Sequence, residues 1–353
     1  MKSYIHSIET NVPPFVHRQT EIEEMFIPRI TDRRTRMLLK RSLRGSGIET
    51  RHSVCKDFFS GELFDETGSA STAKRNEIYE RESRKLAAEL GRKLLDQSPT
   101  FSAGDITHIV FASCTGFVNP GPDFHLIKDL GLKSNVQRFI LGFMGCYAAV
   151  PALRMAKHIA ESDPKANVLV MCLELCSLHL HIEATHDSVL ANSLFADGAG
   201  AAIVSSREPQ KDLPCAAELG EFFTEIIPEG EPDMTWQIGD QGFDLVLSNR
   251  VPEMIESQIG NIVHSICDKD QIDHWAIHPG GRGILDKVQT AVPVPAEKLQ
   301  ISREVMRRYG NMASATVLFV IKDIIEQAES GDETLSVAFG PGLTVEAGML
   351  RKC

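Results

Sequence analysis

The chain contains an internal repeat in which a strand, a helix and a second strand recur about 166 residues later. His108 and His274 each open an apolar strand, at an offset of 166 residues. The helix that begins near Gly145 recurs near Gly310, at an offset of 165. A repeat of this length indicates a duplicated unit. We therefore expect two similar halves related by a pseudo-twofold axis, with equivalent helix N-termini meeting at the centre.

Apolar, β-branched segments alternate with helical patterns along the chain, which is typical of an α/β fold. The predicted strands are His108–Ser113, Val168–Leu175, Gly200–Ser205, His274–Ile277 and Leu335–Phe339. The predicted helices are Ile78–Leu95, Cys146–Glu161, Val251–Cys267 and Ala313–Ala328. From the repeat we expect the two halves to be residues 1–206 and 207–353.

Composition limits the classes of protein that fit the chain. Its 353 residues are 42% hydrophobic and 24% charged, as in a folded globular protein. The formal net charge of −11 argues against nucleic acid as the main partner. The N-terminus lacks a secretory apolar segment, and no apolar run is long enough to span a bilayer, so we expect a cytoplasmic protein without a membrane span.

The eight cysteines are scattered, without the paired spacing of a zinc site or a secretory context for disulfides. We expect each to be a free thiol. Cations concentrate between Arg29 and Arg51, and this stretch is either a face that meets a phosphorylated ligand or an ordinary solvated helix face.

Three residues carry the chemistry that the pattern suggests. Cys146 follows an apolar stretch and a glycine, where the N-terminus of a helix would favour a thiolate; a buried capping cysteine is the alternative. His278 ends a predicted strand, before Pro279. Asn311 opens the helix equivalent to that of Cys146, and could also serve only as an N-cap. On a duplicated fold the three meet as nucleophile, base and amide donor.

The spacing and surroundings of these residues resemble those of the chalcone synthase-like type III polyketide synthases. The similarity covers essentially the whole chain. Its motifs are, in order, Gly-Cys at position 146, His-Pro-Gly-Gly from 278, Gly-Asn-Met-Ala-Ser from 310 and Phe-Gly-Pro-Gly-Leu-Thr-Val-Glu from 339. The resemblance implies a thiolase-like duplicated fold with αβαβα layers and a homodimer. It also implies acyl-CoA and malonyl-CoA as substrates and no separate cofactor.

The resemblance assigns a role to each catalytic residue. Cys146 would hold the starter acyl group, and His278 would form an ion pair that keeps the thiol ionised. His278 and Asn311 would form an oxyanion hole for the enolate left by decarboxylation of malonyl thioester. Phe195 and Phe243 correspond to the two gatekeeper phenylalanines of the family.

Several positions that correspond to the substrate cavity or the CoA site of the plant enzymes differ here. His179 falls near the position of a threonine that lines the cavity in the plant enzymes, and Met234 falls near that of a small glycine on the cavity floor. Ala313 replaces a serine that lies next to the catalytic asparagine in those enzymes. Asn119 replaces a methionine that enters the partner's cavity, and Cys114 ends a strand beside the cavity. A coumaroyl starter is therefore not expected. The basic residues expected to contact CoA are Arg44 and Arg51.

Other interpretations remain open from the sequence. A ketoacyl-carrier-protein synthase III-like enzyme also uses Cys, His and Asn as catalytic residues. A thioester hydrolase with these three residues is a less close alternative. A third alternative is a structural member of the same fold that has no catalytic activity. His179, His181 and Glu183, with His186 and Asp187, have spacings that a metal site could use, but we expect no metal.

Overall fold

The computed structural model of the chain describes residues 1–353 apart from 60, 66–67, 100, 183–185 and 211–214. Nine strands form its main sheet: β1 (Tyr4–Asn11), β6 (His108–Ser113), β7 (Gln137–Gly142), β8 (Asn167–Leu175), β9 (Asp197–Ser205), β10 (Ala217–Ile226), β13 (His274–Ile277), β14 (Glu333–Gly340) and β15 (Thr344–Lys352). They lie in the order β13-β14-β15-β10-β1-β9-β8-β6-β7. The sheet is mixed, because β6, β7 and β8 are parallel whereas β8 and β9 are antiparallel.

The strand order confirms the duplication. In one half β6 and β8 are parallel, β8 and β9 antiparallel, and β9 and β1 antiparallel. In the other half β13 and β14 are parallel, β14 and β15 antiparallel, and β15 and β10 antiparallel. The two blocks join where β1 pairs with β10. The strands that contain His108 and His274 are therefore structural equivalents, as the repeat predicts.

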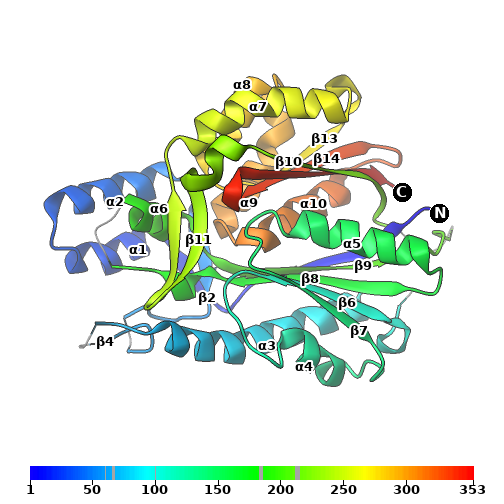
Figure 1. Cartoon of the computed structure of the whole chain (residues 1–353), viewed down its shortest axis with the longest axis horizontal. Coiled ribbons are helices and arrows are strands. Elements are labelled where there is room, and N and C mark those ends of the chain that lie inside the picture. The colour runs from blue at the N-terminus through cyan, green and yellow to red at the C-terminus, as the bar shows by residue number, and fades with distance from the viewer. Residues whose placement is uncertain (60, 66–67, 100, 183–185, 211–214) are drawn as a thin grey trace.

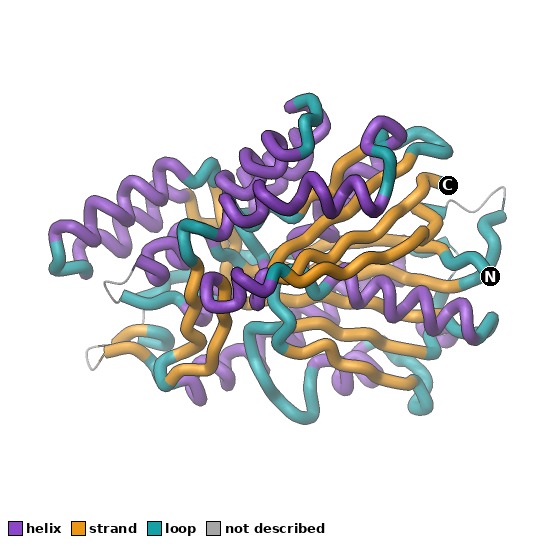
Figure 2. Tube along the Cα trace, turned by 45° about the horizontal axis from the view of Figure 1, so that its top comes forward, coloured by secondary structure: helices purple, strands orange, loops and turns teal. Residues whose placement is uncertain are grey.

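Helices lie on both faces of this double block and between its halves (Figure 1; Figure 2). Their bounds are α1 (Gln19–Phe26), α2 (Arg33–Gly45), α3 (Thr72–Asp96), α4 (Pro122–Asp129), α5 (Ala149–Ser162), α6 (His186–Leu194), α7 (Val251–Ile266), α8 (Arg282–Ala291), α9 (Gln300–Tyr309) and α10 (Thr316–Gln327). Helices α3 and α4 cover the first half, whereas α7 and α8 cover the second. Helices α5 and α10 form the middle layer, giving the expected αβαβα arrangement.

The central position of α5 and α10 follows from their sequences. Helix α10 is apolar on nearly every side, and its residues from Thr316 to Ile321 are all buried. A helix of this kind needs contacts all round. It packs against β1 and β9 of one half and β13 and β14 of the other, and α5 likewise contacts strands of both halves.

Shorter elements complete the described part of the chain. The remaining strands are β2 (Phe15–Arg18), β3 (Thr50–Ser53), β4 (Phe64–Asp65), β5 (Gly68–Ser69), β11 (Met234–Gly239) and β12 (Gly242–Leu247). Short 3-10 helices span Ile27–Arg29, Ala103–Asp105, Cys176–His179, Pro228–Asp233, Lys269–Gln271, Ala296–Leu299, Ala313–Ala315 and Pro341–Leu343. Among the described helices, none combines the length and apolar character of a membrane span.

Two helix starts differ from the prediction. Cys146 is not the first residue of a helix, because α5 begins at Ala149 and Cys146 lies in the turn before it. The predicted helix Ala313–Ala328 begins with a 3-10 turn, Ala313–Ala315, and becomes α-helical at Thr316. Ala313 has a positive φ of 44°, which a regular right-handed α-helix does not allow, and Gly145, just before Cys146, has φ 87°.

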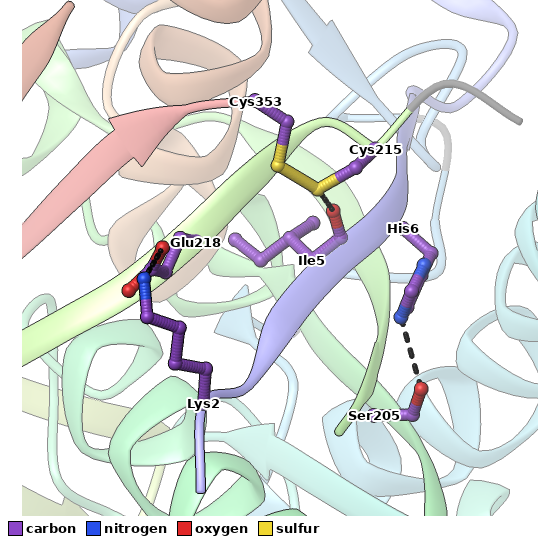
Figure 3. Close-up of a disulfide and its surroundings, with 7 residues drawn as sticks. All are labelled: Lys2, Ile5, His6, Ser205, Cys215, Glu218 and Cys353. Carbon is purple, nitrogen blue, oxygen red and sulfur yellow. Dashed lines mark hydrogen bonds and ion pairs between the residues drawn. A yellow bond between two sulfur atoms is a disulfide. The ribbon is translucent and has the colours of Figure 1, made fainter. Parts of the chain in front are cut away.

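The expectation that every cysteine is free is wrong for one pair. Cys215 and Cys353 form a disulfide across 138 residues of chain (Figure 3). The pairing follows from the sheet: β10 and β15 run antiparallel with Ala217 opposite Lys352, so the cysteines just beyond these two residues meet. The other six cysteines are free.

Candidate active site

One cavity of about 330 Å³ receives all three predicted catalytic residues. Cys146 comes from the turn before α5, His278 from the end of β13, and Asn311 from the loop after α9. The wall also includes Cys114, Thr115, Cys176, His179, Leu180, Phe195, Met234, Trp236, Phe243, Leu245, Leu247, Ala313, Phe339 and Pro341. The equivalent ends of the two halves therefore meet here, as the duplication predicts.

The turn that carries Cys146 is fixed by the loop after β14. A Cβ atom on Gly145 would lie 2.3 Å from Pro341 Cδ, so only glycine fits there, and its φ of 87° also favours glycine. A Cβ atom on Gly340 would lie 2.5 Å from the Tyr147 ring. The Phe-Gly-Pro-Gly motif thus packs directly against the nucleophile turn, which explains why the two motifs occur together.

His278 is held by its backbone while its ring stays available. Its N–H donates to the Val337 carbonyl at 2.8 Å, and its own carbonyl accepts from Gly280 N–H at 2.9 Å. The side chain is buried, yet neither ring nitrogen has a hydrogen-bond partner among the described residues. A buried imidazole without partners is unusual and marks a group kept for a ligand.

Asn311 is positioned from both sides. Its backbone N–H donates to Leu194 O and its carbonyl accepts from Ala196 N–H, both at 2.9 Å, which pairs it with the segment of Phe195. Its amide Nδ2 donates to Gly280 O at 3.1 Å, and its Oδ1 accepts from Ala313 N–H at 2.9 Å. The side-chain amide also hydrogen-bonds the Cys146 thiol and lowers its pKa.

Burial opposes the thiolate expected from the sequence. It raises the pKa of Cys146 to about 12, and the nearby Glu174 adds to this shift, whereas the Asn311 hydrogen bond opposes it. Burial also lowers the pKa of His278 to about 3. Burial thus disfavours both the thiolate and the imidazolium when either forms alone. The predicted effect of a helix N-terminus is weakened because Cys146 precedes α5 by three residues.

Sequence reasoning missed Glu174, a buried carboxylate behind the cavity wall. It accepts hydrogen bonds from Cys114 N–H at 3.0 Å, from Thr115 Oγ1 at 2.8 Å and from Ser314 Oγ. Burial raises the pKa of Glu174 to about 7 despite these bonds. A charged residue inside the apolar predicted strand Val168–Leu175 was the signal that could have identified it.

Six of the seven predicted substrate residues line the cavity: Cys114, His179, Phe195, Met234, Phe243 and Ala313. The ring of His179 stacks on that of Phe243, with centroids 4.0 Å apart and planes 11° apart. Trp236, which was not predicted, meets both rings edge-on and donates from Nε1 to Cys114 O at 2.8 Å. These three rings form an aromatic wall that limits the cavity.

His179 presents its ring face and not a free nitrogen. Its Nδ1 accepts from Phe243 N–H at 3.1 Å, so the proton is on Nε2, which donates to Thr115 O at 2.8 Å. Burial lowers the pKa of His179 to about 3, which keeps the ring neutral. Neither nitrogen is available to a metal. Glu183, which the metal interpretation also needed, lies outside the described residues.

Three predicted contact residues lie outside the cavity wall. Asn119 is exposed in the loop after β6. Arg44 is exposed on α2 and forms two hydrogen bonds to Glu23, at 2.8 and 3.0 Å. Arg51, the other predicted CoA contact, is only 3% exposed and donates to the Phe195 carbonyl at 2.7 Å. Burial lowers the pKa of Arg51 to about 9.

A duplicated, layered fold with a cysteine, a histidine and an asparagine at its centre defines a thiolase-like condensing enzyme. Family comparison makes the assignment specific. The N-terminal domain of chalcone and stilbene synthases matches residues 2–209, and the C-terminal domain of the same family matches residues 218–353. The chain belongs to this family and is a type III polyketide synthase, an enzyme that condenses acyl-CoA with malonyl-CoA.

Named relatives agree over nearly the full length. The chain is 30% identical to the α-pyrone synthesis polyketide synthase-like Pks18 of Mycobacterium tuberculosis over 98% of this chain and 90% of that protein. It is 31% identical to type III polyketide synthase 21 of Oryza sativa subsp. japonica, over 99% and 94%. The C-terminal type III polyketide synthase domain of Steely1 from Dictyostelium superposes with a TM-score of 0.92 and 28% identity, over 100% and 99% of the two chains.

Proposed function

We propose that Cys146, His278 and Asn311 carry both half-reactions of the synthase. The observation that carries this proposal is the convergence of the three on one cavity with both His278 nitrogens unpartnered. His278 takes the Cys146 proton as sulfur attacks the starter thioester, and returns it to the departing CoA thiolate. Burial penalises a thiolate on Cys146 or an imidazolium on His278 when either forms alone, so the negative and positive charges form together and neutralise each other.

The same residues serve the extension step. Malonyl-CoA loses carbon dioxide, and the electron pair of the broken C–C bond forms an enolate whose oxygen accepts from His278 and Asn311. The enolate carbon then attacks the acyl carbon on Cys146, the C–S bond breaks, and Cys146 leaves as a thiolate that is ready for the next acyl group. No resident cofactor or metal is required, and we expect EDTA to leave turnover unchanged.

We propose a medium or long aliphatic acyl starter that is extended and closed to a pyrone or resorcinol. The cavity wall is mainly apolar, and His179 offers no free polar atom to an aryl hydroxyl. The relative Pks18 is named for α-pyrone synthesis. Because CoA thioesters are its substrates, we also propose a cytoplasmic enzyme, which fractionation would test.

The test is incubation with labelled malonyl-CoA and a panel of acyl-CoA starters, followed by mass spectrometry of products and intact protein. We expect extended products from aliphatic starters, and no acyl adduct with Cys146→Ala. Cys176→Ser is a matched control, because this thiol lines the same cavity. Turnover of aryl starters alone would remove the starter assignment. Extension only from a malonylated carrier protein would instead support a ketoacyl synthase III-like enzyme.

We also propose a homodimer that uses the edge strand β7. Ile140 on β7 is 57% exposed, and Phe117, on the loop that also carries Asn119, is 44% exposed. The two line one shallow hollow of about 80 Å³. A second subunit would cover this apolar surface and bring Asn119 to its partner's cavity. We expect light scattering to report a dimer, and Ile140→Glu to weaken it.

A further inference from the structure

Strand β3 and the residue before it hold the loop that carries Asn311, although the two segments lie far apart in the sequence. Glu49 N–H donates to the Arg307 carbonyl at 2.7 Å. The Thr50 hydroxyl donates to the Arg308 carbonyl at 2.6 Å. Both carbonyls lie at the end of α9, shortly before Asn311. The first half of the molecule therefore fixes the loop from which Asn311 reaches the cavity.

Arg51, the next residue of β3, continues this contact into the interior. Its aliphatic stem lies against Gly310, since a Cβ atom added to that glycine would be 2.9 Å from Arg51 Cγ and 3.0 Å from the Leu194 carbonyl oxygen. Its Nη1 donates to the Phe195 carbonyl at 2.7 Å. Phe195 in turn forms a β-bridge with Asn311. Arg51 thus contacts the residue that precedes Asn311 and the residue that pairs with it.

The bridge between Phe195 and Asn311 determines where the Asn311 amide lies. If the bridge shifts, the amide Nδ2 moves with its main chain. An oxyanion donor acts only when it lies about 3 Å from the oxygen on which charge develops. A small displacement, even one caused away from the reacting atoms, therefore lowers the rate strongly.

The guanidinium of Arg51 is costly to bury. The side chain is almost fully buried, and its Nε and Nη2 have no hydrogen-bond partner among the described residues. Burial lowers the pKa of Arg51 to about 9, and the nearby charge of Asp197 opposes that shift. An apolar side chain of similar volume would usually fill such a place at lower cost. The cation is explained by its hydrogen bond to the Phe195 carbonyl, which an apolar side chain cannot make.

Arg51 does not line the catalytic cavity that the described residues form, so it acts through its neighbours. We propose that Arg51 is a positioning residue for decarboxylation, and that its contacts with Phe195 and Gly310 hold the Asn311 amide where it meets the enolate oxygen. This role rests on the proposed function of Asn311 as an oxyanion donor.

The test is a double-mutant cycle on the release of labelled carbon dioxide from saturating malonyl-CoA. Arg51→Met keeps an unbranched stem beside Gly310 but removes the hydrogen bond, and should lower release about tenfold. In an Asn311→Ala background the same change should lower release by less than about twofold, because the donor that Arg51 positions is already absent. Arg51→Lys retains the charge and a donor and should lie between Arg51→Met and the native protein. If Arg51→Met does not fold, the same comparison is made with Arg51→Lys.

Arg75→Met is the matched control. Arg75 is also a fully buried arginine, and it donates to the main-chain carbonyls of Leu178 and Leu180 in a different part of the cavity surroundings. Its replacement removes the same kind of contact without touching the bridge. We expect Arg75→Met to change release by the same factor with asparagine or alanine at position 311, once release is corrected for the folded fraction from circular dichroism.

Equal factors for Arg51→Met in the two backgrounds would overturn the proposal and leave Arg51 a support of the fold only. A higher KM for malonyl-CoA with unchanged maximal release would also overturn it, and would assign Arg51 to CoA binding. Failure of the proposed function is distinguishable from either result, because Asn311→Ala alone would then release carbon dioxide at the native rate.

Discussion

At the scale of single residues, the protonation of Cys146 can be measured directly. Because burial raises its pKa to about 12, we expect iodoacetamide labelling to accelerate steadily from pH 7 to alkaline pH. Asn311→Ala should move this profile to higher pH, since the Asn311 hydrogen bond lowers the thiol pKa. Intact mass and a Cys146→Ser control would identify the labelled thiol. A plateau beginning below pH 7 would instead indicate a thiolate–imidazolium pair before substrate binds.

Asn311 allows a second test, of electrostatics during decarboxylation. Asn311→Ala should lower the release of carbon dioxide from malonyl-CoA by about a hundredfold, as expected for one lost oxyanion donor. Asn311→Asp should lower it further, because a carboxylate would repel the developing enolate. The measurement is release of labelled carbon dioxide. Asp retaining more activity than Ala would contradict the proposed role.

Glu174 should impose a pH dependence on stability. Its pKa is near 4.5 when unfolded and about 7 when folded, so the folded state binds its proton more tightly. Stability is therefore fully retained below pH 4.5 and falls as pH rises towards 7, by about 3 kcal/mol. Glu174→Gln should remove this loss and unfold at higher denaturant concentration than the native protein at pH 8, with little difference at pH 4.5. A variant less stable at both pH values would show that the hydrogen bonds of Glu174 outweigh its burial.

At the scale of elements, prediction succeeded where a segment is apolar throughout. The strands containing His108 and His274 have the predicted bounds, because each is a short apolar run whose limits are marked by its own sequence. The start of α5 was misplaced because the turn at Gly145 is set by Pro341, almost two hundred residues away. Trp236 was missed for a similar reason, since β11 reaches the cavity only through tertiary packing.

The contact between Gly145 and Pro341 can be tested with a matched pair of glycines. Gly145→Ala should destabilise the fold by about 3 kcal/mol, combining a positive φ with overlap of the proline ring. Gly131→Ala has a similar φ, 67°, but no atom within 4 Å of the added carbon, and should cost about 1 kcal/mol. Urea unfolding of both variants gives the comparison. Equal losses would mean that the loop moves aside at no cost.

At the scale of the whole molecule, the duplication could be predicted from the sequence, but the strand pairing that joins the two halves could not. The join between β1 and β10 brings together residues more than two hundred positions apart. The Cys215–Cys353 disulfide depends on the antiparallel pairing of β10 with β15, and no spacing rule indicates such a pair. Long-range pairing of this kind lies beyond local patterns.

This disulfide closes 138 residues, nearly the whole second half, into one covalent loop. A loop of that length limits the unfolded chain strongly, and its loss should lower the free energy of unfolding by up to about 5 kcal/mol. Cys353→Ser should therefore unfold at lower denaturant concentration than the native protein, whereas Cys267→Ser, which removes a free and partly exposed thiol, should not. Adding reductant should bring the native protein to the stability of Cys353→Ser and leave that variant unchanged. If reductant has no effect and alkylation labels Cys353 in the native protein, the two thiols are reduced in solution, and the β10–β15 pairing alone holds the C-terminus in place.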